Sequence, residues 1–262
     1  MREQGKHIVV SALSHDGLVR DHNEDSLVVG PWTLCASVTR SPQMFLLRLD
    51  HPVVVAVADG LGGHPAGEVA SSLVVQELAR LGPYLDDEDT VRAAVEHVNR
   101  LVYESMQADD DRLMMGTTVA GVVIDPSNTR VFNVGDSRVY AVTGGSLRRL
   151  STDDSPPLEP GQTTTHIVTE TIGGHPAYRA VEVHVSAEPT AAFSRLLVCS
   201  DGLSDVVDED AMGRLLGEHG DGTAAAFALW RAAIEGGGPD NITLAVVDLD
   251  VDLDADRDVD DG

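Results

Sequence analysis

The sequence predicts an α+β fold in which antiparallel sheets carry helices on their outer faces. The first observation is that short runs rich in Val, Ile and Thr, bounded by Gly, Asp or Asn, recur as candidate strands. The second is that apolar residues at helical spacing gather in two neighbouring stretches. The third is their order: strands, two helices, a run of strands, then helices before a last strand. Because strands do not alternate one for one with helices, a simple doubly wound sheet does not fit.

Each element follows from its own pattern. Strands are expected at residues 53–58, 117–124, 131–134, 138–142, 196–199 and 242–247. One helix presents an apolar face made by Ala70, Leu73, Val74, Leu78 and Leu81, and the next a face made by Val91, Ala94, Val95, Val98, Leu101 and Val102. Gly82 and Pro83 separate these two helices. Two further helices are expected at about 208–217 and 223–234, and residues 151–166, with their Pro and Thr, read as an irregular loop.

The charge balance is strongly acidic. Asp and Glu number 43 against 18 Lys and Arg among 262 residues, which gives a formal charge of −25. Residues 248–262 alone hold eight Asp and one Arg. We interpret this end as a solvated tail, in preference to a loose cation-binding stretch. An acidic surface repels phosphate backbones, so nucleic acid is not an expected partner.

The remaining composition indicates a soluble, cytoplasmic protein. Cys35 and Cys199 each lie among apolar residues and form no CxxC, which favours reduced structural thiols. No apolar run approaches the roughly 20 residues that span a bilayer. The start MREQGKH is not followed by the apolar stretch of a signal peptide. No membrane contact is expected, and a monomer is the default.

Four Asp residues share one context, in which a β-rich run lies beside an Asp and a Gly or another small residue. They are Asp59 in VAVADGLGG, Asp136 in VFNVGDSRVY, Asp201 in LLVCSDGLSD and Asp240 in GGGPDNITLAVV; Asp25 is a fifth acidic site ahead of an apolar run. Turn preference alone explains any one of them. Together they indicate a carboxylate cluster, and such a cluster with no Cys suits Mg²⁺ or Mn²⁺ better than zinc.

The loop after Asp59 is rich in glycine, which raises the alternative of a phosphate cradle. It holds neither GxGxxG nor a Lys followed by Ser or Thr, so the dinucleotide fingerprint and the P-loop do not fit. Glycines beside a carboxylate also let carbonyls and waters approach a hard metal ion closely. The loop therefore favours a metal site.

With these segments in place, the chain resembles the metal-dependent Ser/Thr protein phosphatases of the PPM family (type 2C class), in their bacterial form. The resemblance is carried by SALSHDGLVRDHNEDS, VADGLGGHPAGEVAS, MGTTVAGVVI, VFNVGDSRVY, LSTDDS, LLVCSDGLSD and GGPDNITLAVV, in the family's order over about residues 8–249. It implies a four-layer α-β-β-α sandwich with two central, mostly antiparallel sheets. It also implies one catalytic domain over 1–249 with a short flap at about 151–176, followed by the acidic tail 250–262.

The resemblance assigns a role to each motif residue. Asp59 would bridge two Mn²⁺ or Mg²⁺ ions, the carbonyl of Gly60 would contact one, and Asp201 and Asp240 would complete the second. A third, weaker ion would lie between Asp201 and Asp136.

Other residues would act around these ions. Glu24 and Asp25 would hold metal-bound waters, and Asn241 would fix the loop around Asp240. Arg20 would grip the substrate phosphate with its planar fork, the alternative being a surface salt bridge. His64 is a candidate general acid, with a metal-bound water as the other donor. The implied reaction is hydrolysis of phosphoserine or phosphothreonine by metal-activated water without a phosphoenzyme.

Two segments depart from the family pattern. The flap is short, with three Pro and three Thr in 155–166, which affects substrate preference and the third ion. Residues 35–51 form either an ordinary hairpin connection, which we favour, or an added docking surface.

Two other functions compete with that of a protein phosphatase acting on the substrates of a Ser/Thr kinase. A phosphatase-like regulatory module without turnover would typically lose a metal carboxylate, whereas Asp59, Asp201 and Asp240 are all present. A two-metal nuclease is disfavoured by the acidic balance.

Overall fold

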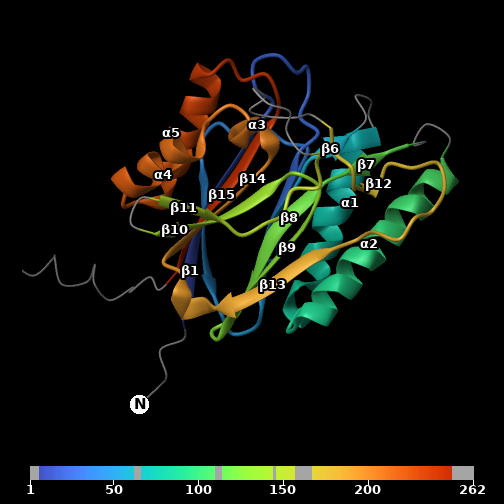
Figure 1. Ribbon diagram of the computed structural model, residues 1–262, viewed down its shortest axis with the longest axis horizontal. Helices are drawn as coiled ribbons and strands as arrows, with labels where there is room; N and C mark the ends of the chain where they lie inside the picture. Colours follow the sequence, from blue (N-terminus) through green and yellow to red (C-terminus); the bar gives the residue numbers. More distant parts are fainter. Residues whose placement is uncertain (1–5, 62–65, 110–113, 144–145, 157–166, 250–262) are drawn as a thin grey trace, which may run out of the picture.

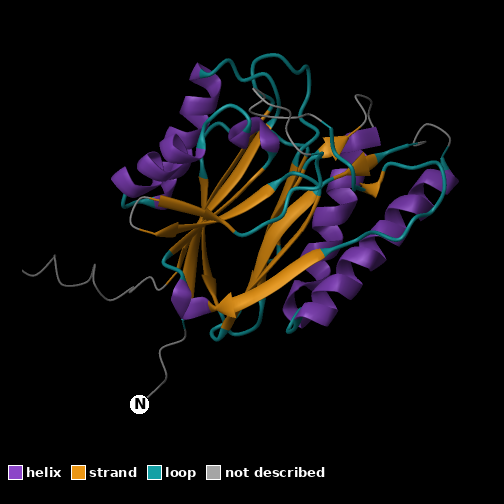
Figure 2. Ribbon diagram, viewed as in Figure 1, coloured by secondary structure: helices purple, strands orange, loops and turns teal. Residues whose placement is uncertain are grey.

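The computed structural model describes residues 6–61, 66–109, 114–143, 146–156 and 167–249. Two six-stranded sheets face each other at the centre, with helices packed on both outer faces (Figures 1 and 2). This is the four-layer α-β-β-α sandwich that the sequence predicts. Every strand pairing within the described residues is antiparallel.

In the first sheet, the first and last described strands of the chain, β1 (His7–His15) and β15 (Ile242–Leu249), pair with each other. The order of this sheet is β11 (Ser146–Arg149), β10 (Arg138–Thr143), β14 (Arg195–Cys199), β15, β1 and β4 (Gln43–Arg48). On its outer face lie α4 (Glu209–Glu218) and α5 (Gly222–Glu235), and the short α3 (Asp201–Ser204) follows β14 directly. Asp208 and Asp221 cap α4 and α5 by accepting backbone N–H bonds in the first turn.

The second sheet carries the longer helices. Its order is β13 (His184–Pro189), β9 (Asn128–Val134), β8 (Val119–Ile124), β5 (Val53–Ala58), β2 (Ser26–Val29) and β3 (Trp32–Cys35). Helices α1 (Ala66–Leu81) and α2 (Glu88–Ala108) cover its outer face, with the 3₁₀ turn Gly82–Tyr84 between them (Figure 1). Asp87 and Thr90 form a capping box that begins α2. A small third sheet, β12 (Ile172–Gly173), β7 (Gly116–Thr117) and β6 (Gly60–Leu61), lies near one end of the sandwich.

Three apolar cores hold the four layers together. The central core joins the inner faces of the two sheets, with Val55, Val122 and Val247 among its fully buried members. The strands β5 and β8 are buried along their whole length because their other face packs under α1 and α2. A third core lies between the first sheet and α4 and α5. Burial on both faces explains why these strands read as continuous apolar runs.

The predicted elements are found close to their expected bounds, with additions. The expected strand 117–124 is divided into β7 and β8 at Thr118. The sequence pattern did not predict β1, β2, β3, β4, β6, β11, β12 and β13, nor the short helix α3. The favoured hairpin at 35–51 is wrong. Its strand β4 pairs with β1 in the first sheet, while the preceding β3 belongs to the second sheet, so the segment crosses between sheets. His64 and the tail 250–262 lie outside the described residues.

Candidate active site

The sequence-predicted site residues come together at one end of both sheets. Asp59 follows β5, Asp136 lies in the β9–β10 turn, Asp201 begins α3 after β14, and Asp240 precedes β15. The loop between β1 and β2 supplies Arg20, Glu24 and Asp25, while Gly60 and Asn241 directly follow Asp59 and Asp240. The side chains line a hollow of about 180 Å³ whose lining residues are Arg20, Glu24, Asp59, Gly60, Leu61, Asp136, Val168, Asp201, Asp240 and Asn241.

The backbone of Asp59 is fixed by two threonines of the neighbouring segment. Its carbonyl accepts hydrogen bonds from Thr117 Oγ1 at 2.7 Å and from the Thr118 backbone N–H at 2.9 Å. Its own N–H donates to Thr118 Oγ1 at 3.3 Å. The Thr-Thr pair of MGTTVAG therefore orients Asp59 into the hollow.

Gly60 lies where the chain has no room for a side chain. A Cβ there would come within 2.6 Å of the Gly67 carbonyl and 2.7 Å of the Glu24 carbonyl oxygen. The start of α1 and the β1–β2 loop thus pack directly against the Gly60 backbone. A glycine is required at this position by that close approach.

Asp25 is fully buried beneath the hollow. One of its carboxylate oxygens, Oδ2, accepts a hydrogen bond from Ser200 Oγ at 2.8 Å, while Oδ1 is buried without a hydrogen-bond partner. An orphaned buried carboxylate oxygen is rare in proteins and indicates a missing cationic or donor partner. The serine before Asp201 thereby positions Asp25, a contact that the sequence does not reveal.

Asn241 ties the β1–β2 loop to the start of β15. Its Oδ1 accepts the Glu24 N–H at 2.8 Å, and its amide donates to the carbonyls of Asp16 at 3.1 Å and His22 at 2.9 Å. His22, which the sequence analysis did not name, lies with Nε2 3.1 Å from Glu24 Oε1. Glu24 and Asn241 are thus held in one network beside Asp240.

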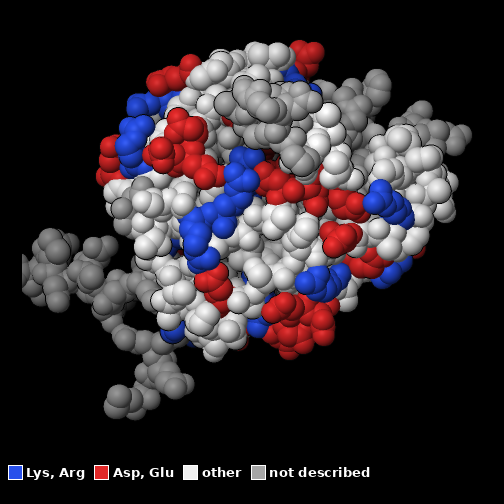
Figure 3. All heavy atoms as spheres, viewed as in Figure 1, with Lys and Arg blue, Asp and Glu red and all other residues white. Residues whose placement is uncertain are grey.

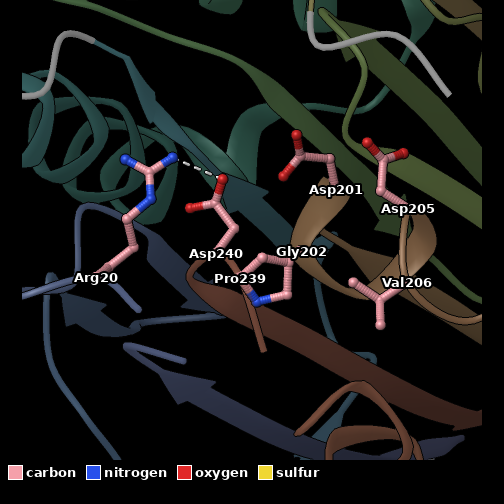
Figure 4. Close-up of a pocket in the computed structure, with 7 residues that line it drawn as sticks. All are labelled: Arg20, Asp201, Gly202, Asp205, Val206, Pro239 and Asp240. Carbon is pink, nitrogen blue, oxygen red and sulfur yellow. Dashed lines mark hydrogen bonds and ion pairs between the residues drawn. The ribbon is translucent and has the colours of Figure 1, made fainter. Parts of the chain in front are cut away.

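Arg20 lies at the mouth of the hollow. Its Nη2 donates to Asp240 Oδ2 at 2.7 Å, as the dashed line in Figure 4 marks, and about half of its side chain is exposed. This arginine brings one positive charge to a set of several carboxylates. The open side of its guanidinium is available to an incoming anion.

The carboxylates raise one another's pKa. Burial raises the pKa of Asp59 well above its ordinary value, and the charges of Asp25, Asp201, Asp136 and Asp240 raise it further. Burial likewise raises the pKa of Asp25 to about 7, although hydrogen bonds from Ser200 and Thr243 act in the opposite direction. The raised pKa values show that the nearby positive charge does not balance the negative charge of these carboxylates.

Asp205 is a site residue that the sequence analysis missed. It lies four residues after Asp201, and its charge, after burial and the charge of Asp201, helps to raise the pKa of Asp136 to about 7. In Figure 4 the carboxylates of Asp201 and Asp205 point to the same side of their helix. The spacing in SDGLSD, one helical turn from Asp to Asp, is the signal that could have identified it.

The donor set fits a hard divalent cation. All candidate ligands are oxygens, several have raised pKa values, and one buried Asp25 oxygen lacks a partner. Within the described ranges, no three His, Cys, Asp or Glu side chains converge closely enough to enclose an ion by themselves. Mg²⁺ usually keeps several of its waters and needs only a few protein ligands, so such convergence is not required.

A four-layer sandwich with an acidic, all-oxygen site at one end of its sheets defines the class of metal-dependent phosphatases. The comparisons agree. The sequence profile of the protein phosphatase 2C family matches residues 44–226. The chain therefore belongs to the protein phosphatase 2C family.

Individual relatives support this assignment. The chain is 32% identical over 252 residues to a serine/threonine phosphatase, stp, of Listeria monocytogenes, covering 90% of this chain and 93% of that protein. It is also 32% identical to the serine/threonine protein phosphatase PstP of Mycobacterium tuberculosis, covering 91% of this chain but only 44% of PstP. The chain thus spans less than half the length of PstP.

A solved structure of the PstP catalytic domain in complex with two manganese ions has a TM-score of 0.74 and 30% identity to this chain. The match covers 94% of this chain and all of that one. No helix among the described residues has the length and apolarity needed to cross a membrane.

Proposed function

We propose that this chain is a metal-dependent phosphatase that hydrolyses phosphoserine and phosphothreonine in proteins. The observation that carries the proposal is the acidic hollow at the end of both sheets, with Arg20 at its mouth. Relatives named as serine/threonine phosphatases, aligned over nine-tenths of the chain, support the same reaction.

Asp59, the Gly60 carbonyl, Asp201 and Asp240 would hold two Mn²⁺ or Mg²⁺ ions. Asp136 and Asp201, joined by Asp205, would hold a third. When bound, such ions lower the pKa of water and neutralise charge on phosphoryl oxygens. The manganese complex of PstP supports the choice of metal.

The chain's own residues do the rest. Arg20 binds two phosphate oxygens and holds the phosphorus at the mouth of the hollow, which places the leaving Ser or Thr oxygen towards solvent. Asp25, held by Ser200, and Glu24, held by Asn241, accept hydrogen bonds from the attacking water and orient it. His64 stays one candidate proton donor to the leaving oxygen, and a metal-bound water is the other.

No side chain is needed as a nucleophile. Cys199 lies two residues before Asp201, but burial raises the pKa of its thiol to about 12. It therefore stays protonated and packs in the core beneath α3 and α5. Direct attack by water, without a phosphoenzyme, fits this arrangement.

Substrates made by a Ser/Thr kinase, a monomeric state and a cytoplasmic location stay predictions from the sequence. So does the division into a catalytic domain and an acidic tail.

The test is hydrolysis of a phosphothreonine peptide by metal-stripped protein, titrated with Mn²⁺ and then Mg²⁺. We expect turnover that depends on added metal and that is lost in Asp240→Ala. Asp50→Ala, which removes an exposed carboxylate whose partner is the nearby Arg48, is the matched control and should keep full activity. Folded protein without turnover in either metal would instead support the regulatory module.

A further inference from the structure

A second hollow lies beside the first, and its apolar lining has no role in the hydrolysis described above. It has a volume of about 280 Å³ and shares Arg20, Asp201 and Asp240 with the first hollow. Its other lining residues include Val206 and Pro239, which lie on the opposite side from the carboxylates in Figure 4. A phosphate held by Arg20 would therefore sit at the border of the two hollows, with apolar surface next to it.

That apolar surface continues onto the turn that carries Arg20. Leu18 and Val19 directly precede Arg20, and their exposed fractions are 63% and 67%. Large aliphatic side chains this exposed, in pairs and beside a site, commonly mark a binding surface. We call Leu18, Val19 and Pro239 the Leu18 rim.

The Leu18 rim is held in place by backbone contacts. The Leu18 N–H donates to the Gly238 carbonyl at 2.8 Å, and a Cβ on Gly17, whose φ is +76°, would lie 2.2 Å from the Asp240 carbonyl oxygen. The turn is thus packed directly on the loop that bears Asp240. Its exposed side chains are presented by a fixed backbone, which lowers the entropy lost when a ligand covers them.

A second apolar rim is formed by Ile167 and Val168. Val168 lines the first hollow, and Ile167 beside it is 61% exposed. Apolar residues from distant parts of the chain thus lie at the two adjoining hollows: Val168 lines the first, Pro239 lines the second, and Leu18 packs beside Gly238, next to Pro239. On the face shown in Figure 3, Asp and Glu lie beside Lys and Arg in several clusters, with broad areas of other residues between them.

We propose that the two rims bind the residues flanking the phosphorylated Ser or Thr, and that they select substrates with bulky aliphatic or aromatic side chains there. This inference rests on the proposed phosphatase function. The occupant is an extended segment of a phosphoprotein, because the phosphate must enter the first hollow while the chain on either side crosses a rim. The acidic hollow adds a penalty for Asp or Glu at the same flanking positions.

The experiment compares phosphothreonine peptides that differ only at the two residues on either side of the phosphothreonine: Leu and Val, Ser and Gly, or Asp and Glu. kcat/KM is measured for each peptide and for para-nitrophenyl phosphate, with protein loaded with Mn²⁺. We expect about a tenfold preference for the aliphatic over the Ser/Gly flanks, equivalent to ~1.4 kcal/mol. In the double variant Leu18→Gln, Val19→Gln, kcat/KM for the aliphatic peptide relative to para-nitrophenyl phosphate should fall by about the same factor.

The matched control is the double variant Met44→Gln, Leu46→Gln. These side chains on β4 are 66% and 52% exposed, and they line neither hollow. Their replacement should leave the flank preference unchanged. Equal loss in both double variants would overturn a role specific to the Leu18 rim.

A binding assay makes the test independent of turnover. Fluorescence anisotropy with non-hydrolysable phosphonate versions of the same peptides should show the same order of affinity. Equal affinity or equal kcat/KM for the aliphatic and Ser/Gly peptides would refute the rim proposal while leaving the phosphatase intact. If no peptide were hydrolysed but the aliphatic peptides still bound more tightly, the proposed catalysis would be refuted and the proposed binding of flanking residues by the rims would be supported.

Discussion

Replacing Asp136 by Asn should stabilise the metal-free protein, and by more as the pH rises. Asp136 is 7% exposed, and burial together with the charges of Asp201 and Asp205 raises its pKa to about 7, from an ordinary 3.8. The folded state therefore keeps a proton that the unfolded chain releases near pH 4. As the pH rises from about 4 through 7, the free energy of unfolding falls. The reason is that burial and the neighbouring negative charges disfavour the ionised form of Asp136 in the folded state, whereas the unfolded chain ionises freely. An asparagine does not ionise and escapes this loss.

The magnitude follows from the size of the shift. A difference of about 3 pKa units corresponds to about 4 kcal/mol at full ionisation, at 1.36 kcal/mol per unit. Part of the loss is already present at pH 5, since the unfolded carboxyl is ionised there. Between about pH 5 and pH 8 the advantage of Asp136→Asn should therefore grow by about 3 kcal/mol.

The assay is urea unfolding at both pH values in the presence of a chelator. Asp50→Asn, at an exposed position, should show no such growth. Addition of Mn²⁺ should reverse the order, with the unmodified protein gaining more stability than Asp136→Asn because it keeps the proposed ligand of a third ion. If the difference in free energy of unfolding between Asp136→Asn and the unmodified protein were the same at pH 5 and pH 8, the argument that the fold disfavours ionisation of Asp136 would be refuted.

Three further outcomes are expected. Arg20→Ala should raise KM for a phosphothreonine peptide more than it lowers kcat, with Arg20→Lys intermediate; an unchanged KM would speak against phosphate binding by the guanidinium. In folded protein, iodoacetamide should modify half-buried Cys35 and spare Cys199, whose thiol pKa is raised to about 12 by burial, as read by mass spectrometry of the peptides; equal labelling rates would contradict this. Removal of residues 250–262 should leave kcat/KM and Tm unchanged, and an inactive truncation would place the tail in the site.

Strands were predictable from the sequence where burial on both faces makes a continuous apolar run. β5 and β8 are of this kind, and both were found. β1 is buried over most of its length but carries Ser11 and Ser14, which interrupt its apolar pattern. Those hydroxyls are hydrogen-bonded to Thr223 at 3.1 Å and Thr243 at 2.7 Å, contacts that only the folded chain reveals.

Edge strands were missed for a different reason. β13 has only one neighbour, is largely exposed, and ends in Pro189, so its sequence reads as a loop. β4 alternates exposed and half-buried residues, and its partner β1 lies about 35 residues earlier in the chain, so local spacing does not reveal the pairing. Pairing of this range depends on tertiary contacts and not on local propensity.

The candidate site was partly predictable because its members share a local context. Asp59, Asp136, Asp201 and Asp240 each lie beside a strand, and the fold brings these strand ends together. Asp205 lacks that context, since it follows one turn of helix. The hydrogen bond from Ser200 to Asp25 joins residues 175 positions apart, and no spacing rule reaches that far.

The carboxylates that form the site also lower the free energy of unfolding of the metal-free protein at neutral pH. Asp25, Asp59 and Asp136 all have raised pKa values. Among the described residues that line the hollow, Arg20, paired with Asp240, brings the one positive charge. A lysine or a second arginine inside the hollow would relieve the repulsion, but it would also occupy the space that a hydrated cation needs. A bound cation would relieve this repulsion and add stability to the fold, which would link stability to activity. The Mn²⁺ concentration that restores half of the stability of the metal-free protein at pH 8 should match the concentration that restores half of the turnover. A protein fully stabilised by metal at concentrations that leave it inactive would separate the two effects and point to the proposed third ion as the one that catalysis requires.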